Sequence, residues 1–172
     1  MNKAVFLDRD GTINVDYGYV YRIDDFKFID GVIEGLKILN DLGYLLIIIT
    51  NQSGIGRAFY SEKDFEILNN YMLNELEKNK IHISAVYHCP HVDKDNCSCR
   101  KPKLELFYRA IKDFDIDVSK SFAIGDKKRD LAICEKENIT GILISNKNDK
   151  KYICKDNFLK AVQYIKKLSG SD

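Results

Sequence analysis

Residues 4–12 read AVFLDRDGT, and this stretch decides the fold class. Its four leading apolar residues predict a short strand buried on both faces, which ends at Asp8. Asp8 and Asp10 are two positions apart, so their side chains point to the same side of an extended chain. Gly11 permits a sharp turn after them. A pair of carboxylates could therefore face one ion or substrate, although solvated loop carboxylates or a calcium site would also produce this local pattern.

Short strand-like runs alternate with longer helix-like segments along the rest of the chain. Strands are predicted at 4–7, 44–49, 84–87, 121–124 and 141–144. Helices are predicted at 32–42, 61–76, 104–114, 130–137 and 158–168. This alternation predicts right-handed crossovers and a Rossmann-like α/β fold, in which helices cover both faces of a parallel sheet.

Three predicted strands end at polar residues, namely Asp8, Thr50 and Asp126. In open parallel sheets, ligands bind outside the carboxyl ends of the strands, near the point where the strand order reverses. The three side chains are therefore expected at one edge of the sheet, around one ligand.

Length and composition limit the possible classes of protein. The 172 residues suit a single domain over residues 1–172, and a second full-sized core would not fit. The net charge of +1 provides no general field for capturing nucleic acid. The longest apolar run, 44–49, is too short to span a bilayer, and the N-terminus lacks the features of a signal peptide. These observations predict a cytoplasmic protein that binds neither nucleic acid nor membrane, and a monomer is the default expectation.

Three of the five cysteines gather with a histidine in the pattern C-x-H-x5-C-x-C. The four predicted ligands are Cys89, His91, Cys97 and Cys99. Three thiolates and an imidazole complete a tetrahedral Zn²⁺ site with no open position, which predicts a structural role. Because Arg100 and Lys101 follow directly, folding around zinc would hold both over the strand ends. Cys134 and Cys154 stand alone, and no role is predicted for them.

The strand-end motifs together resemble those of the haloacid dehalogenase (HAD) superfamily. DRDGT at 8–12 is similar to its nucleophile motif, and TNQSG at 50–54 is similar to the second motif. RKP at 100–102 resembles the third, and GDKKRD at 125–130 resembles the fourth, GDxxxD. Each motif alone has an ordinary explanation, such as a strand-end turn or a surface basic pair. Four in the expected order favour the superfamily.

This resemblance implies a magnesium-dependent phosphatase. The segments between Asp10 and Thr50 and between Ser53 and Lys101 leave little room for a large cap domain, which favours a small phosphorylated metabolite as the substrate. Mg²⁺ would be held by Asp8, the main-chain carbonyl of Asp10, and Asp126. Asp8 would attack phosphorus to form an aspartyl-phosphate, and Asp10 would serve as general acid and then as general base.

The resemblance assigns the remaining catalytic roles to three other residues. Thr50 and Lys101 would stabilise the negative charge of the transferring group. Asp130 would support both the magnesium ligands and Lys101 from behind.

With the predicted zinc loop, the chain resembles the branch that contains D-glycero-D-manno-heptose 1,7-bisphosphate phosphatases and histidinol-phosphate phosphatases. The segments INVDYGYV at 13–20 and FIDGV at 28–32 are similar to the heptose enzymes, which serve lipopolysaccharide biosynthesis. By that match, the substrate would contact Asp16, Tyr17, Gly18, Tyr19, Thr50, Asn51, Gln52, Ser53, Arg100, Lys101 and Lys127. Arg100 is the candidate for the second phosphate, because a guanidinium binds oxyanions in a bidentate manner.

One segment departs from the heptose enzymes. They continue the third motif with a Pro-Gly pair, whereas this chain reads KLEL at 103–106, closer to histidinol-phosphate phosphatase. The substrate is therefore predicted to be the heptose bisphosphate, with histidinol phosphate as the alternative.

Two readings without phosphatase activity also fit parts of the pattern. One is an inactive, zinc-stabilised binding module, and the other is a phosphoacceptor similar to a response regulator. The presence of both Asp8 and Asp10 disfavours the first, and Asp10 with the zinc loop disfavours the second.

Overall fold

The computed structural model describes residues 1–170, and its centre is a six-stranded parallel sheet in the order β3-β2-β1-β4-β5-β6. The strands are β1 (Ala4–Leu7), β2 (Leu45–Asn51), β3 (Ala85–Cys89), β4 (Phe122–Gly125), β5 (Thr140–Ile144) and β6 (Ile153–Lys155). The chain runs outward from β1 to β3 and then returns to β4 on the other side of β1. The strand order therefore reverses between β1 and β4, which places a ligand site at their carboxyl ends.

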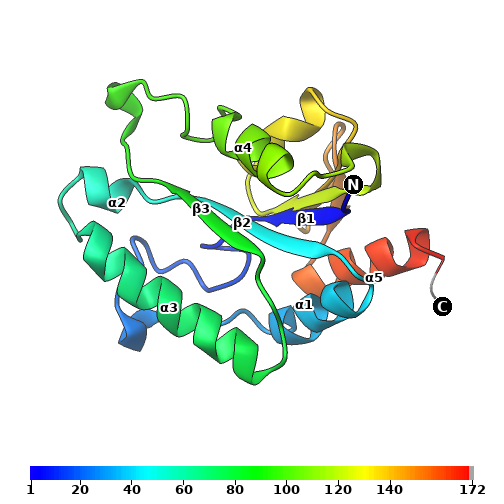
Figure 1. Cartoon of the computed structure of the whole chain (residues 1–172), viewed down its shortest axis with the longest axis horizontal. Helices are drawn as coiled ribbons and strands as arrows, with labels where there is room; N and C mark the ends of the chain where they lie inside the picture. Colours follow the sequence, from blue (N-terminus) through cyan, green and yellow to red (C-terminus); the bar gives the residue numbers. More distant parts are fainter. Residues whose placement is uncertain (171–172) are drawn as a thin grey trace.

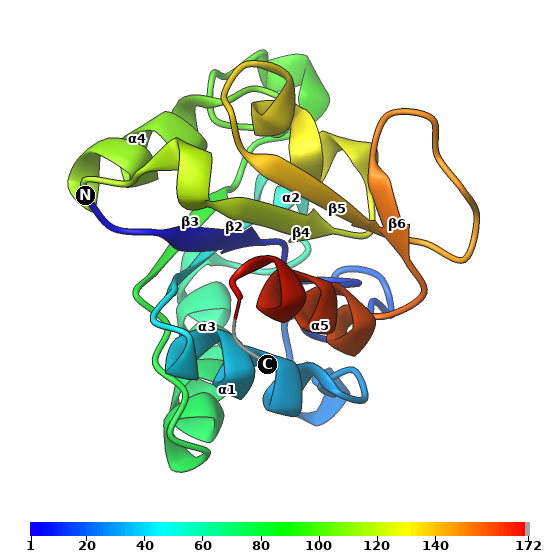
Figure 2. The ribbon, with the colours of Figure 1, turned by 90° about the vertical axis from the view of Figure 1, so that its right-hand side faces the viewer.

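Helices cover both faces of this sheet, as Figures 1 and 2 show. The α-helices are α1 (Val32–Asp41), α2 (Ser53–Gly56), α3 (Glu62–Lys78), α4 (Glu105–Asp113) and α5 (Phe158–Leu168). Short 3₁₀ helices span Ile23–Asp25, Asp93–Asp95, Val118–Lys120 and Lys128–Glu135. The predicted α/β class, with helices on both faces of a parallel sheet, is confirmed.

Alternate residues of β1 feed two separate cores, as expected when successive strand side chains face opposite ways. Val5 and Leu7 pack with α1, α3 and α5 on one face. Ala4 and Phe6 pack with α4 and the 3₁₀ helix over Lys128–Glu135 on the other. Burial on both faces explains why β1 is uniformly apolar.

Helix α3 begins as the sequence predicts. The Ser61 hydroxyl accepts a hydrogen bond from the Asp64 N–H, and the Asp64 carboxylate accepts one from the Ser61 N–H. This capping box satisfies two N–H groups that a helix end leaves without partners.

Several predicted boundaries need correction. The segment predicted as a helix at 130–137 is a 3₁₀ helix over Lys128–Glu135. The helix predicted at 32–42 ends one residue earlier, at Asp41. Strand β6 was not predicted, because three residues are too short to establish a period and β6 is defined by its pairing with β5.

The long segment between β1 and α1 contains only the 3₁₀ helix over Ile23–Asp25 and isolated bridges, so no large cap is inserted there. We call residues 13–28 the flap, since they lie beside the strand ends. Within residues 1–170, none of the helices is both long and apolar enough to cross a membrane.

Candidate active site

A buried cluster of charged side chains lies at the carboxyl ends of β1 and β4. Asp8 follows β1, and Asp126 and Asp130 follow β4. One carboxylate oxygen from each of the three lies within 4.8 Å of the others. Because like charges at this distance repel one another, the arrangement favours a bound cation.

Lys101 extends from the loop before α4 into the same cluster. Its Nζ donates to Asp8 Oδ1 at 2.8 Å, to Asp130 Oδ1 at 2.8 Å and to the Ile49 carbonyl at 2.6 Å. Burial lowers the pKa of Lys101, but the charges of Asp8 and Asp130 outweigh that effect and the net shift is upward. Lys101 is therefore a fixed positive charge at neutral pH.

Burial raises the pKa of Asp8, and the neighbouring Asp130 raises it further, while Lys101 opposes both and the result is about 7. Burial likewise raises the pKa of Asp126. A bound cation would favour the charged form of both carboxylates, because it compensates their buried negative charge.

Two features of Asp126 fit a metal ion. Its buried Oδ1 has no hydrogen-bond partner among the described residues, so it remains available as a ligand. Gly11 has φ +87°, and a Cβ at this position would lie 2.4 Å from Asp126 Oδ2. Glycine therefore permits both the turn after β1 and the close approach of Asp126.

The Asp10 carboxylate does not belong to this carboxylate cluster. Arg9 donates to both of its oxygens, at 2.9 and 3.2 Å, Asn14 donates to Oδ1 at 3.0 Å, and Gln52 donates to Oδ2 at 2.9 Å. These four hydrogen bonds hold the Asp10 side chain outside the cluster of Asp8, Asp126 and Asp130, although Asp10 is only two residues from Asp8 in the sequence. The expected ligand from Asp10 is its main-chain carbonyl, so its side chain is available for proton transfer.

Above the cluster lies a cavity of about 320 Å³. It is lined by Asp8, Asp10, Asp16, Gly18, Tyr19, Asn51, Gln52, Ser53, Arg57, Tyr60, Arg100, Lys127 and Arg129. Ten of these were expected from the sequence at the catalytic or substrate positions. Thr50, Lys101, Asp126 and Asp130 lie outside this lining, and Tyr17, expected at the substrate, also lies outside it with an exposed ring.

Sequence reasoning missed Arg57, Tyr60 and Arg129 in this lining. Arg57 is the C-cap of α2, and Arg129 lies inside the GDxxxD motif, so both lie close to strand-end motifs, but those motifs do not show which way the two side chains point. Tyr60 had no such signal, because a tyrosine between two helices is usually a packing residue. All three are positioned by turns whose direction the local pattern does not reveal.

Ion pairs link the loops around the cavity. Lys127 Nζ lies 3.3 Å from Asp126 Oδ2 and 3.8 Å from Asp16 Oδ2, which connects the β4 loop to the flap. Arg100 forms an ion pair with Asp93, and Arg57 and Arg129 also lower the pKa of that carboxyl after Arg100. Arg100 is therefore the ion-pair partner of this exposed carboxylate, and the charges of Arg57 and Arg129 act on it from farther away.

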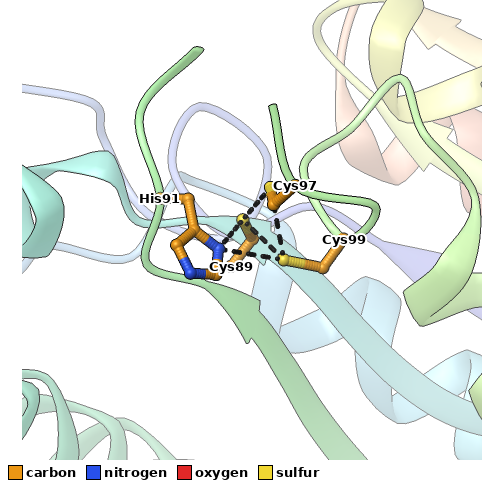
Figure 3. Close-up of side chains that lie close together, drawn as sticks. All are labelled: Cys89, His91, Cys97 and Cys99. Atoms are coloured by element: carbon orange, nitrogen blue, oxygen red, sulfur yellow. Dashed lines mark hydrogen bonds between the residues drawn. The ribbon is translucent and has the colours of Figure 1, made fainter. Parts of the chain in front are cut away.

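The predicted cysteine and histidine ligands converge in the loop between β3 and α4, as Figure 3 shows. Cys97 Sγ lies 3.6 Å from the Sγ atoms of both Cys89 and Cys99, and the Sγ atoms of Cys89 and Cys99 lie 2.9 Å apart. His91 Nδ1 lies 3.6 Å from Cys89 Sγ and 3.3 Å from Cys99 Sγ. A tetrahedral ion with metal–sulfur bonds of about 2.3 Å would separate its sulfur ligands by about 3.8 Å. Burial strongly raises the pKa of Cys89, so a cation would be needed to keep its thiolate. The four side chains could hold one metal ion.

This parallel sheet, with Asp8 after β1 and the buried Lys101 beside it, is the arrangement expected of a HAD-type phosphatase. Comparisons with known proteins agree. A family model described as "Polynucleotide kinase 3 phosphatase" matches residues 3–157.

Relatives of high similarity carry a more specific name. A protein from Haemophilus influenzae, D-glycero-beta-D-manno-heptose-1,7-bisphosphate 7-phosphatase, is 49% identical over 137 residues, which cover 76% of this chain and 74% of its own. A protein from Campylobacter jejuni, named as the corresponding alpha enzyme, is 45% identical over 148 residues, covering 86% and 85%. The chain therefore belongs to the heptose-1,7-bisphosphate 7-phosphatase family of the HAD superfamily, and the predicted family and phosphatase class are confirmed.

Solved structures share the fold. The D,D-heptose 1,7-bisphosphate phosphatase from B. bronchiseptica, complexed with magnesium and phosphate, matches with a TM-score of 0.86 at 21% identity, covering 96% of this chain and 99% of that one. The corresponding enzyme from Burkholderia thailandensis matches with a TM-score of 0.69 at 24% identity, covering 95% and 97%.

Proposed function

We propose that this phosphatase removes the 7-phosphate of D-glycero-D-manno-heptose 1,7-bisphosphate, in the biosynthesis of activated heptose for lipopolysaccharide. The observation that carries the proposal is the convergence of Asp8, Lys101 and Asp126 beneath a cavity bordered by three arginines. A site with a reaction centre and a separate cationic rim suits a substrate with two phosphates. The identity of the sugar in this proposal comes from the names of the relatives.

Asp8, Asp126 and the main-chain carbonyl of Asp10 would hold the catalytic Mg²⁺, with Asp130 behind them. Three hard oxygen donors fit this ion, and the unpartnered Asp126 Oδ1 supports the assignment. When bound, Mg²⁺ neutralises phosphoryl charge and so permits the approach of a carboxylate.

In the first step, an Asp8 oxygen attacks phosphorus in line. A bond from Asp8 to phosphorus forms as the bond from phosphorus to the sugar oxygen breaks, and Asp10 gives its proton to that oxygen. Lys101 and the Thr50 hydroxyl stabilise the charge on the transferring oxygens.

In the second step, Asp10 takes a proton from a water molecule. The water oxygen bonds to phosphorus as the Asp8–phosphorus bond breaks, which releases phosphate and restores both aspartates. Lys101 keeps the departing Asp8 carboxylate stabilised, since its Nζ lies 2.8 Å from Asp8 Oδ1.

Arg57, Arg100 and Arg129 would bind the phosphate that is not cleaved. In the present arrangement, their charge is compensated in part by Asp93, whose side chain is highly exposed. An incoming phosphate could displace this carboxylate at little cost, because exposed ion pairs contribute little free energy. The flap residues Asp16 to Tyr19, Ser53 and Lys127 would contact the sugar.

The second metal ion would be Zn²⁺, held by Cys89, His91, Cys97 and Cys99 in a structural site. Arg100 and Lys101 directly follow the last ligand. Zinc would therefore hold in place both the cationic rim and the buried lysine. The protein would work in the cytoplasm as a monomer on this small metabolite.

The substrate assignment predicts a preference that kinetics can measure. We expect kcat/KM on heptose 1,7-bisphosphate to exceed kcat/KM on histidinol phosphate by at least about 100-fold, because only the bisphosphate reaches both the reaction centre and the arginines. Phosphate release should be followed with both substrates at saturating Mg²⁺. Equal or reversed values would contradict the heptose assignment and favour the histidinol alternative.

Replacement of Arg100 should act on the second phosphate. For Arg100→Ala, we expect kcat/KM on the bisphosphate to fall by about 30- to 100-fold, the effect of losing one charge-assisted contact of about 2 to 3 kcal/mol. On a heptose 7-monophosphate the loss should be about threefold or less. The matched control is Arg109→Ala, in an exposed part of α4, which should leave kcat/KM unchanged on both substrates. Equal losses on the bisphosphate and the monophosphate would remove Arg100 from the second-phosphate site.

A further inference from the structure

Tyr60 forms one end of a hydrogen-bond chain that leads to Asp10. Its hydroxyl donates to Gln52 Oε1 at 2.5 Å, and Gln52 Nε2 donates to Asp10 Oδ2 and to Thr50 Oγ1, both at 2.9 Å. Tyr60 and Gln52 are almost completely buried. The chain therefore lies in a water-poor environment, where hydrogen-bond geometry is well determined.

The Tyr60 hydroxyl decides which way the Gln52 amide faces. An amide has two donors at one end and an acceptor at the other, and here each end has a matching partner. With the amide reversed, Oε1 would face Asp10 Oδ2, and the ionised form of Asp10 would then meet a second acceptor with no hydrogen between them. Burial raises the pKa of Tyr60 to about 12, so the hydroxyl keeps its proton at neutral pH and continues to donate.

Two contacts hold the Tyr60 ring in place. A Cβ at Gly54 would lie 2.0 Å from the ring, so glycine leaves the space that the ring occupies. The ring also stacks on the Tyr21 ring of the flap, with centroids 5.1 Å apart and an angle of 10° between the ring planes. A ring held in this way keeps its hydroxyl at one position.

The other hydrogen-bond partners of Asp10 hold its Oδ2 less closely than its Oδ1. Arg9 and Asn14 hold its Oδ1, and Arg9 reaches Oδ2 only at 3.2 Å. Gln52 is therefore the closest donor to Oδ2. Together with the Arg9 contacts to both oxygens, this hydrogen bond restricts the rotation of the carboxylate.

We propose that Tyr60 is a positioning residue for phosphoryl transfer, which acts through Gln52 to orient the Asp10 carboxylate for its proton transfers. The inference rests on the proposed role of Asp10, but it does not depend on the identity of the sugar. Thr50 serves as the second anchor of the Gln52 amide.

This role predicts a dependence on the leaving group. A sugar or alkyl oxygen needs the Asp10 proton as its bond to phosphorus breaks, whereas p-nitrophenolate leaves as a stable anion without it. A defect confined to Asp10 should therefore slow the first step with an alkyl phosphate and spare it with p-nitrophenyl phosphate. The second step uses Asp10 as a base with either substrate.

Tyr60→Phe removes the hydroxyl and keeps the ring in its stack. We expect kcat on an alkyl or sugar phosphate to fall about tenfold, with KM within about twofold, the effect expected from one buried hydrogen bond. In single turnovers with enzyme in excess, release of p-nitrophenolate should stay within about twofold of the unmodified protein. An equal loss in both measurements would overturn the proposal, because it would place the defect at the phosphoryl group.

A double-mutant cycle tests whether Tyr60 acts through Gln52. Gln52→Ala should lower kcat on the alkyl phosphate at least as much as Tyr60→Phe, and the double variant should be no slower than Gln52→Ala alone. If the two losses multiply, Tyr60 acts by another route and the proposal fails. Gln52→Glu provides a second variant that leaves Tyr60 unchanged. It replaces the donor to Asp10 with a carboxylate oxygen and should reproduce the same leaving-group pattern with a larger loss.

The matched control is Tyr44→Phe. Tyr44 is also a buried tyrosine, and its hydroxyl shares a hydrogen bond with Ser169, but it directly precedes β2, at the amino end of the strand and away from the site. Removal of the Tyr44 hydroxyl should leave kcat unchanged on every substrate. All of these measurements use an alkyl phosphate and p-nitrophenyl phosphate. A wrong heptose assignment would therefore appear only in the comparison of heptose bisphosphate with histidinol phosphate. A wrong role for Tyr60 would appear only in the Tyr60→Phe measurements and the double-mutant cycle.

Discussion

Asp8→Asn should lower phosphate release by about 10⁴-fold or more, since it removes the nucleophile from the reaction. An amide cannot form the aspartyl-phosphate, and the other catalytic groups have nothing to assist. Turnover should be measured at saturating Mg²⁺ on heptose bisphosphate and on p-nitrophenyl phosphate, and the loss should be similar with both. A covalent phosphate trapped on the peptide that contains residue 8 should be found in the unmodified protein and be absent from the variant.

The same substitution should leave the fold intact. Asparagine has the shape of aspartate and still offers Oδ1 to the Lys101 Nζ, which lies 2.8 Å away. Burial already raises the pKa of Asp8, so a neutral side chain there relieves a cost as well as losing an ion pair. Thermal unfolding should therefore shift little. Asp41→Asn, on an exposed part of α1, should keep full activity and serves as the control. Turnover above about 1% in Asp8→Asn would exclude Asp8 as the nucleophile.

Cys97→Ser should release the structural metal ion. Serine is a poor zinc ligand, and loss of one ligand from a closed tetrahedral site should lower metal affinity by about 100-fold or more. Metal analysis should show close to one zinc per unmodified chain and little in the variant. We also expect kcat/KM to fall by about tenfold or more, because Arg100 and Lys101 follow this loop and would lose their support.

Two comparisons distinguish this result from a general loss of stability. Cys134→Ser changes a cysteine outside the cluster and should keep both zinc and activity. Removal of zinc from the unmodified protein with a chelator, followed by return of Mg²⁺ alone, should reproduce the kinetic defect of Cys97→Ser. Normal zinc content in Cys97→Ser would refute the four-ligand site.

The motifs at the strand ends were readable because they depend on local sequence. A buried strand has a continuous apolar run, and the polar residue that ends it marks the edge where parallel strands deliver their side chains. Asp8, Thr50 and Asp126 could be placed near one another on this basis, and the spacing of Cys89 to Cys99 predicted one cluster. The structure brings Asp8 and Asp126 together and gathers the three cysteines with His91, whereas the Thr50 hydroxyl accepts a hydrogen bond from Gln52.

Contacts between distant segments had no such local pattern. The 3₁₀ form of Lys128–Glu135 and the pairing of β6 with β5 depend on neighbours far along the chain. The same is true of Arg57 and Arg129, which reach the cavity through the direction of two turns.

The amino-acid sequence alone determined the α/β class and the family, because hydrophobic period and motif order are properties of short segments, and it predicted the residues of the reaction centre. Only the tertiary structure decided how Tyr60, Gln52 and Asp10 meet, and that the Asp10 side chain lies outside the carboxylate cluster. Hydrogen bonds between side chains from separate loops depend on ångström-scale placement, which packing around the sheet sets and no local pattern encodes.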